Sequence, residues 1–358
     1  MRRLEVLVGT KKGAFILDGD AVRHDWLVRG PFCETWPIHH FVRAADGTLY
    51  AAGGNAWYGP SVWRSDDDGV NWSQSSSGLT YGDDGPKITT IWNLTPSVDG
   101  KTVYAGVEPA GLFRSDDLGE TWTHVAGLRD HYSRPDWQPG AGGLCLHSIA
   151  LDPADPAHMW IAISAAGTFE TTDGGATWST RNKGVRADFI PGPPPEFGHC
   201  VHNLRLDPTN PERLFQQNHC GVYRTEDGGA TWTEITAGLP SEFGFPLSIH
   251  PHDPTTIWTI PHNGPEAGRH MIGGQAAVWR SRDRGDSWQR LDAGLPQHNA
   301  FLTVYREAMA VDRLDPVGVY FGTSTGHVFA SADEGDHWRM LADFLPPVWS
   351  VEAAVVED

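Results

Sequence analysis

Histidine and glutamate side chains recur where short alternating apolar segments of the chain begin. His202 opens "HNLRLDP", and His147 opens "HSIALDP" with the same spacing of apolar residues. Side chains two residues apart share one face of a strand. On that basis seven such segments align at one position, which we expect to be occupied by His40, Thr90, His147, His202, Leu247, Glu307 and Trp349.

Three imidazoles and a carboxylate in one layer suit a divalent metal ion. Imidazole and carboxylate groups bind zinc, manganese or iron, and three His ligands with an oxygen donor leave room for water or substrate. We therefore expect a metal site, without a nucleotide cofactor, formed by His40, His147, His202 and Glu307. The alternative is structural, with each histidine donating a hydrogen bond to the neighbouring repeat unit.

Other polar residues are expected on the same side of the molecule. The turns after the second apolar segment of a unit contain Glu108, His219 and His262. With Glu307 they are candidate general acids and bases, whereas no GxSxG motif supplies a nucleophile. Two cysteines, Cys145 and Cys200, lie two residues before His147 and His202. Their thiolates either join the site or fill small buried positions.

One short pattern occurs six times and sets the architecture. The pattern, here called the box, reads for example "SDDDGVNW" or "TEDGGATW". It begins, at intervals of 50 to 56 residues, at Ser65, Ser115, Thr171, Thr225, Ser281 and Ser331. Two apolar runs and a short third run precede each box, and a fourth run begins at its Trp. Four short strands per unit, stacked on their neighbours, predict an all-β propeller.

The box resembles S/T-x-D-x-G-x-x-W, the Asp-box or BNR repeat of sialidase-like β-propellers. The resemblance covers about residues 60–340. It implies that each box lies in the turn between the third and fourth strands, away from the functional face. Ser or Thr, Asp and Gly can close such a turn by hydrogen bonds while the Trp packs beneath it. We therefore expect a structural role for Asp67, Asp117, Asp173, Asp227, Asp283 and Asp333.

The two ends of the chain carry parts of a seventh unit that has no box. Residues 4–29 match the second, third and fourth strands of a unit, and residues 348–355 match a first strand. We predict a single domain over residues 1–358, a seven-bladed β-propeller of four-stranded blades. One C-terminal and three N-terminal strands would close the ring, because closure removes exposed strand edges.

The composition argues against several classes of partner. Forty-five acidic against 27 basic residues give a formal charge of −18, which repels nucleic acid and anionic membranes. No apolar run reaches the roughly 18 residues that span a bilayer, and the first residues lack the cleavage site of a secretion signal. We expect a cytoplasmic protein that binds a small molecule or a sugar. A protein partner stays an open alternative.

The resemblance constrains the fold more than the function, because it includes sialidases, xyloglucan-cleaving glycosidases, sortilin-type receptors and photosystem assembly factors. It implies an arginine triad for a sialidase, with the first arginine in an R-I-P segment that this chain lacks. Arg43 and Arg205 are expected on the strand face opposite the histidines. Only Arg306 then lies at the start of a first strand, which is too few for the triad. Sialidase activity is therefore not expected. Xyloglucan-type enzymes resemble paired seven-bladed units around a cleft, so cleavage of long polysaccharides by one unit is not expected either.

We expect instead a carbohydrate- or small-molecule-processing enzyme, a hydrolase or lyase, that acts at the mouth of the propeller channel. A metal ion there would polarise a substrate oxygen or activate water. Irregular loops on the same rim, including residues 129–143 and 181–199, would shape the site. The alternative is a noncatalytic binding or assembly module, which would show neither bound metal nor turnover.

Overall fold

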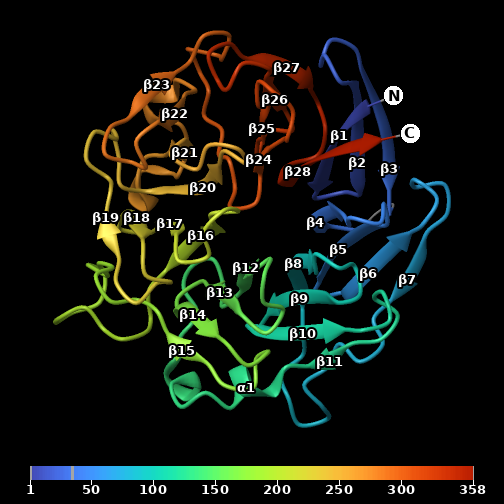
Figure 1. The fold of residues 1–358 in the computed structure, drawn as a ribbon, viewed down its shortest axis with the longest axis vertical. Coiled ribbons are helices and arrows are strands. Elements are labelled where there is room, and N and C mark those ends of the chain that lie inside the picture. The colour runs from blue at the N-terminus through green and yellow to red at the C-terminus, as the bar shows by residue number, and fades with distance from the viewer. Residues whose placement is uncertain (1, 34–35, 358) are drawn as a thin grey trace.

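The computed structural model of the chain describes residues 2–33 and 36–357. Seven antiparallel sheets of four strands are arranged as blades around a central axis (Figure 1). The strands nearest this axis are β4, β8, β12, β16, β20, β24 and β28. The structure therefore confirms the predicted all-β fold, a seven-bladed β-propeller.

Blades 1 to 6 follow the order of the chain. Blade 1 contains β4 (Ile38–Arg43), β5 (Leu49–Asn55), β6 (Gly59–Ser65) and β7 (Ser73–Ser75). Blade 2 contains β8 (Thr90–Pro96), β9 (Val103–Glu108), β10 (Gly111–Ser115) and β11 (Thr123–His124). Blade 3 contains β12 (Leu146–Leu151), β13 (Met159–Ile163), β14 (Gly167–Thr171) and β15 (Ser179–Thr180). Blade 4 contains β16 (Val201–Leu206), β17 (Leu214–Asn218), β18 (Gly221–Thr225) and β19 (Thr233–Glu234).

The remaining elements complete the ring. Blade 5 contains β20 (Gly244–Ile249), β21 (Ile257–Pro261), β22 (Val278–Ser281) and β23 (Gln289–Leu291). Blade 6 contains β24 (Met309–Val311), β25 (Val319–Gly322), β26 (Val328–Ser331) and β27 (Arg339–Ala342). The connections include the short helix α1 (Ala126–Arg129) and three 3₁₀ turns, Arg134–Asp136, Pro265–Ala267 and Ile272–Gly274. None of the described helices is long and apolar enough to cross a membrane.

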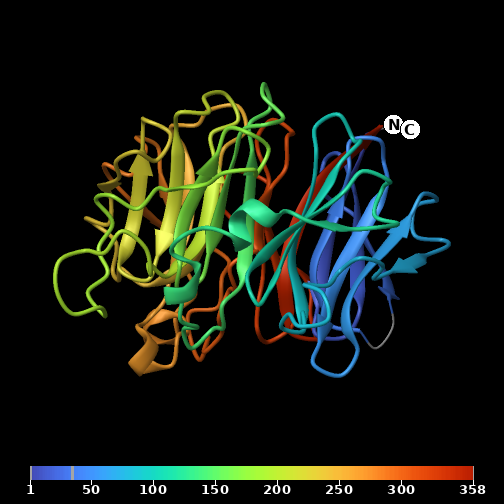
Figure 2. The ribbon, with the colours of Figure 1, turned by 90° about the horizontal axis from the view of Figure 1, so that it is seen from below.

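Blade 7 joins the two ends of the chain as predicted. It consists of β28 (Val348–Glu357), β1 (Arg2–Thr10), β2 (Ala14–Asp20) and β3 (Trp26–Phe32), in that order. The antiparallel pairing of β28 with β1 places Ala353 opposite Val6. The N and C ends consequently lie side by side (Figure 2). This pairing covers the strand edges that either end would otherwise expose.

Every box forms the turn between the third and fourth strands, as the resemblance implies. In blade 4, Thr225 Oγ1 donates to Asp227 Oδ1 at 2.6 Å and accepts the Gly229 amide at 3.0 Å. Asp227 also accepts from the Thr231 amide at 2.9 Å. The equivalent Asp contacts recur in the other five boxes. The box carboxylates are thus engaged by their own turns.

Buried tryptophans connect neighbouring blades. Trp160 in β13 and Trp258 in β21 are fully buried. Trp160 Nε1 donates to the Gly228 carbonyl in the box of blade 4 at 2.8 Å, and Trp258 Nε1 donates to Glu334 in the box of blade 6 at 3.0 Å. Each ring adds a directional bond to the apolar packing between blades. The core therefore lies between the blades, which leaves polar side chains near the axis.

A β-bulge interrupts the innermost strand of several blades. In blade 4, Val201 pairs with Asn218 and Asn203 pairs with Gln217, so His202 is an extra residue. The same shift occurs in blades 1, 2, 3 and 7 at His39, Trp92, His147 and Trp349. A bulge places two residues opposite one and breaks the alternation of side chains. It therefore changes which residues are equivalent around the ring.

Candidate functional site

The bulges show that the predicted alignment of the innermost strands, which was based on apolar alternation, is wrong in part. The structurally equivalent residues are the bulged ones, so His40 and Thr90 lie one residue after and two residues before the bulges of their blades. The shared pattern is an aliphatic, a ring-bearing and a polar residue in succession. It reads Ile38-His39-His40, Ile91-Trp92-Asn93, Leu146-His147-Ser148, Val201-His202-Asn203 and Val348-Trp349-Ser350. This triplet is the sequence signal that aligns the blades correctly.

His147 and His40 use their ring nitrogens in hydrogen bonds. His147 Nε2 donates to the Val201 carbonyl of blade 4 at 2.9 Å, and its Nδ1 accepts the Ser148 hydroxyl at 2.9 Å. His40 Nδ1 accepts the Leu94 amide of blade 2 at 3.3 Å, which in a neutral ring leaves the proton on Nε2. Neither neutral imidazole then keeps a lone pair for a metal ion. Both histidines therefore hydrogen-bond to the neighbouring blade, as the structural alternative predicts, although His40 accepts its bond and only His147 donates.

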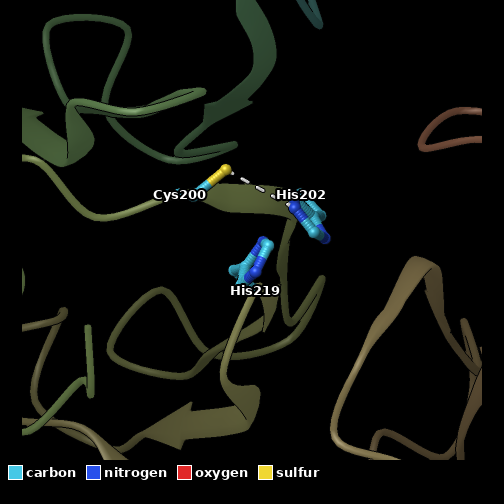
Figure 3. Close-up of side chains that lie close together, drawn as sticks. All are labelled: Cys200, His202 and His219. Atoms are coloured by element: carbon cyan, nitrogen blue, oxygen red, sulfur yellow. Dashed lines mark hydrogen bonds between the residues drawn. The ribbon is translucent and has the colours of Figure 1, made fainter. Parts of the chain in front are cut away.

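His202 differs because the only hydrogen-bond partner of its second nitrogen is a thiol. Its Nδ1 donates to the Gly244 carbonyl of blade 5 at 2.6 Å, and its Nε2 faces Cys200 Sγ at 3.5 Å. His219 lies beside them, and the ligand atoms of the three residues are within 4.8 Å of one another (Figure 3). Burial, and then the charge of Arg306, lowers the pKa of His202 well below its usual range. The four predicted metal ligands therefore do not form one set among the described residues.

Glu307 is the centre of a buried polar cluster on the axis. Its side chain is 3% exposed, and its Oε2 accepts from Arg205 Nη2 at 2.8 Å. Its Oε1 lies 3.3 Å from Ser148 Oγ and 3.4 Å from Asn203 Nδ2. These contacts join blades 3, 4 and 6. The sequence placed Arg205 on the face opposite the histidines, and the bulge at His202 explains why it instead reaches Glu307.

A second carboxylate, which the sequence analysis missed, lies next to Glu307. The side chain of Glu352 in β28 is 31% exposed. One of its oxygens, one Glu307 oxygen and a His40 nitrogen all lie within 4.8 Å of one another. The structure thus brings His40 and Glu307 together and adds Glu352 to them. Glu352 follows Ser350 by two residues, so the triplet alignment is the signal that would have drawn attention to it.

A pocket of about 410 Å³, here called the axial pocket, is lined by Glu307 and by aromatic and cationic side chains. The His39 ring stacks on Trp349 with centroids 4.1 Å apart and lies 5.0 Å from the Trp92 ring. Arg306 also lines the pocket, and its Nε has no hydrogen-bond partner among the described residues. Flat rings beside a few converging polar groups are typical of a small-molecule site.

The other predicted acid and base residues occupy different surroundings. Glu108 Oε2 accepts the Trp92 indole N–H at 2.8 Å, so Glu108 supports one wall of the axial pocket. His262 is fully buried, and its Nε2 accepts the Val304 amide at 3.1 Å. Burial lowers the pKa of His262 to about 3. His219 belongs to the group with Cys200 and His202. Glu307 is therefore the predicted residue with the most direct access to the pocket.

Two wider grooves lie between blades 2 and 3, one of about 830 Å³ beside β11 and α1 and one of about 750 Å³ beside the β8–β9 and β12–β13 turns. Their acidic residues already serve local structure. Asp173 accepts from Thr171 and Thr177 in its box, and the Thr177 hydrogen bonds lower the pKa of Asp173 to about 2. Asp152 accepts the Ala154 amide in its own turn. The axial pocket, with its converging buried groups, is the stronger candidate site.

The fold and this site define a seven-bladed β-propeller with an aromatic-lined polar pocket on its axis. No family model matches the chain. A probable oligoxyloglucan-reducing end-specific xyloglucanase of Neosartorya fischeri is 26% identical over 258 residues, which cover 61% of this chain and 30% of that protein. A xyloglucanase of Paenibacillus is 25% identical over 260 residues, covering 64% of this chain and 23% of that protein. The chain spans less than a third of either relative.

The solved structures show the same architecture. The GH74 enzyme of Niastella koreensis matches with a TM-score of 0.63 at 17% identity, covering 97% of this chain and 51% of that one. At this identity the match shows the shared propeller fold. The sequence homologues of the chain are carbohydrate-processing glycosyl hydrolases.

Proposed function

We propose that the chain is a carbohydrate-processing hydrolase whose substrate binds in the axial pocket. The observation that carries the proposal is the buried Glu307 carboxylate in the wall of a pocket lined by Trp92, Trp349 and Phe245. Sugar rings pack on flat aromatic faces, while a few polar groups fix their orientation. The xyloglucanases among the homologues support a saccharide as the class of substrate.

Glu307 and Glu352 are the residues that we assign to the reaction. Glycosidases use one carboxyl group to protonate the leaving oxygen and another to attack the anomeric carbon or activate water. Glu307, held by Arg205 and Asn203, is suited to the second role, and the partly exposed Glu352 is suited to proton transfer. Their nearest oxygens lie within 4.8 Å. Since retaining enzymes separate the two groups by about 5 Å, we expect retention of anomeric configuration.

Hydrolysis of a panel of oligosaccharides by the purified chain tests this proposal through the release of reducing ends. Glu307→Gln is expected to lower kcat by about 100-fold or more while circular dichroism stays unchanged. Glu212→Gln, in the exposed turn between β16 and β17, is the control that should keep full activity. Parent-like turnover by Glu307→Gln would refute the assignment. An unsaturated product that absorbs in the ultraviolet would identify a lyase instead.

A noncatalytic binding module is the second candidate, and one observation favours it. Both oxygens of Glu307 already have partners within the chain, Arg205 on one side and Asn203 on the other. A carboxylate held in this way also serves as a structural link between blades. Under this alternative a ligand binds in the axial pocket without turnover. Saturable binding of a saccharide that is recovered intact after prolonged incubation would support it.

A further inference from the structure

We propose that Cys200, His202 and His219 form a binding site for a Zn²⁺ ion, separate from the carboxylates on the axis. Cys200 lies immediately before β16, His202 is the bulged residue of that strand, and His219 follows β17. The sulfur and one nitrogen from each ring converge to within 4.8 Å of one another (Figure 3). Thiolate and imidazole are ligands that zinc prefers, and three of them leave a fourth position open.

The distance between Cys200 and His202 fits a shared metal ion. With a Zn–S bond of about 2.3 Å and a Zn–N bond of about 2.0 to 2.1 Å, tetrahedral geometry separates the two ligand atoms by about 3.5 Å. Cys200 Sγ and His202 Nε2 are 3.5 Å apart. A hydrogen bond from the Cys200 thiol to the His202 ring would also explain this distance, but it would not require a third residue nearby. The His219 ring, whose centroid lies 5.6 Å from that of His202, supplies the third donor that a metal requires.

The surroundings of His202 hold its ring in a state that can bind metal. Its Nδ1 donates to the Gly244 carbonyl at 2.6 Å, which places the lone pair on Nε2. The ring also packs against Phe243 and Phe245, with centroids 5.2 and 4.8 Å away. His147 occupies the same bulged position in blade 3, but both of its nitrogens are engaged. A second nitrogen that faces a thiol, which can become a metal ligand itself, therefore distinguishes His202 from its structural equivalent.

Binding would fix two loops and connect them to the axial pocket. Zn²⁺ forms a bond to the Cys200 sulfur as the thiol proton leaves to solvent, and it links the segment before β16 to the β17–β18 turn. Cys200 Sγ lies 3.7 Å from Ser164 Oγ, and that hydroxyl accepts from Arg306 Nη2 at 3.4 Å. Arg306 in turn lines the axial pocket.

Titration of metal-free protein with Co²⁺, followed by displacement with Zn²⁺, tests the site. The parent chain is expected to bind one equivalent of Co²⁺ with a thiolate-to-cobalt charge-transfer band, which one equivalent of Zn²⁺ removes. Cys200→Ser should abolish the band and weaken Zn²⁺ binding by about tenfold or more. Cys220→Ser, a buried cysteine next to His219, should retain both. A parent spectrum without the thiolate band, or equal effects of the two substitutions, would overturn the proposal.

A second measurement uses the unsubstituted chain and does not depend on its activity or on the folding of a variant. Alkylation by iodoacetamide is followed at each cysteine by peptide mass spectrometry, with and without saturating Zn²⁺. Zn²⁺ should slow alkylation of Cys200 by about tenfold or more, because the metal-bound sulfur is shielded, and leave the rate at Cys33 unchanged. Unaltered alkylation of Cys200 would contradict the site even if saccharide hydrolysis is observed.

Discussion

At the scale of single residues, His262 shows how burial removes a titratable group from chemistry near neutral pH. The side chain has no exposed surface, and burial lowers its pKa from 6.5 to about 3. Between these two values the unfolded chain binds a proton that the folded chain does not. Folding stability is therefore lost as the pH falls through this range. The neutral His262 ring serves as an acceptor for the Val304 amide.

We predict that His262 accounts for about 2 kcal/mol of the unfolding free energy lost between pH 7 and pH 5. His262→Gln keeps an acceptor near Val304 but removes the titration. Between pH 7 and pH 5 the unfolding free energy of His262→Gln should therefore decrease less than that of the parent. This holds even if the variant is less stable than the parent at pH 7. Urea denaturation at the two pH values measures the difference. An equal decrease in both proteins would contradict the prediction.

Arg306 is the residue that we expect to select the charge of the ligand. Its Nε lacks a hydrogen-bond partner among the described residues, and its guanidinium lies 5.2 Å from the centroid of the Phe245 ring. Arg306→Met keeps apolar contact with that ring and removes the charge. We predict a loss of about tenfold in affinity for a saccharide that carries a carboxylate, with little change for a neutral one.

Calorimetric titration with a matched pair of neutral and acidic oligosaccharides measures this effect. Arg282→Met is the control, because the Arg282 side chain is 53% exposed at a box of the outer rim. If Arg306→Met lost equal affinity for the neutral and the acidic saccharide, the side chain would shape the pocket without selecting the charge of the ligand.

At the scale of the elements, the box is a turn that stabilises a blade and takes no part in the reaction. Asp227→Ala removes the hydrogen bonds that the carboxylate accepts from Thr225 and Thr231. We predict a loss of about 1 to 3 kcal/mol in unfolding free energy. Saccharide binding should be unchanged, and Asp83→Ala in an exposed loop should leave both properties unaltered. A stable Asp227→Ala protein that no longer binds ligand would place the box in the site.

The blades could be predicted from the sequence because the box, its spacing and the apolar runs repeat along the chain. The two incomplete units at the ends then predicted how β28 and β1 pair. The inner-strand alignment was harder, because a bulge adds one residue without altering composition. Alternation grouped His40 with His147 and His202, whereas pairing groups His39 with them. Hydrogen bonds that cross blade interfaces, such as that of His147, have no local sequence pattern.

At the scale of the whole molecule, the strand that closes the ring also supplies part of the site. Trp349 and Glu352 both belong to β28, which pairs with β1 from the other end of the chain. Glu307 meets side chains from blades 3 and 4. The candidate site therefore depends on the closed ring, and loss of closure should remove fold and function together.

Truncation before Val348 tests the role of closure. The shortened chain exposes the edge of β1 and loses the buried side chains of Val348 and Val351. We predict loss of the cooperative thermal transition, with aggregation through the exposed edge. A chain that ends at Val356 should melt like the parent, because it lacks only the exposed Arg2–Glu357 contact among the described pairs. Cooperative melting and monomeric elution of the chain truncated before Val348 would contradict the topology.

The most direct test of the central claim is calorimetric titration of Glu307→Gln, which should bind an oligosaccharide without consuming it. We predict one binding site per chain. In this background Trp349→Ala should weaken affinity by about tenfold or more, because it removes a wall of the axial pocket. Trp57→Ala, at a ring that is 92% exposed, should bind as before. Equal affinities of the Trp349 and Trp57 variants, or no saccharide binding at all, would contradict the account.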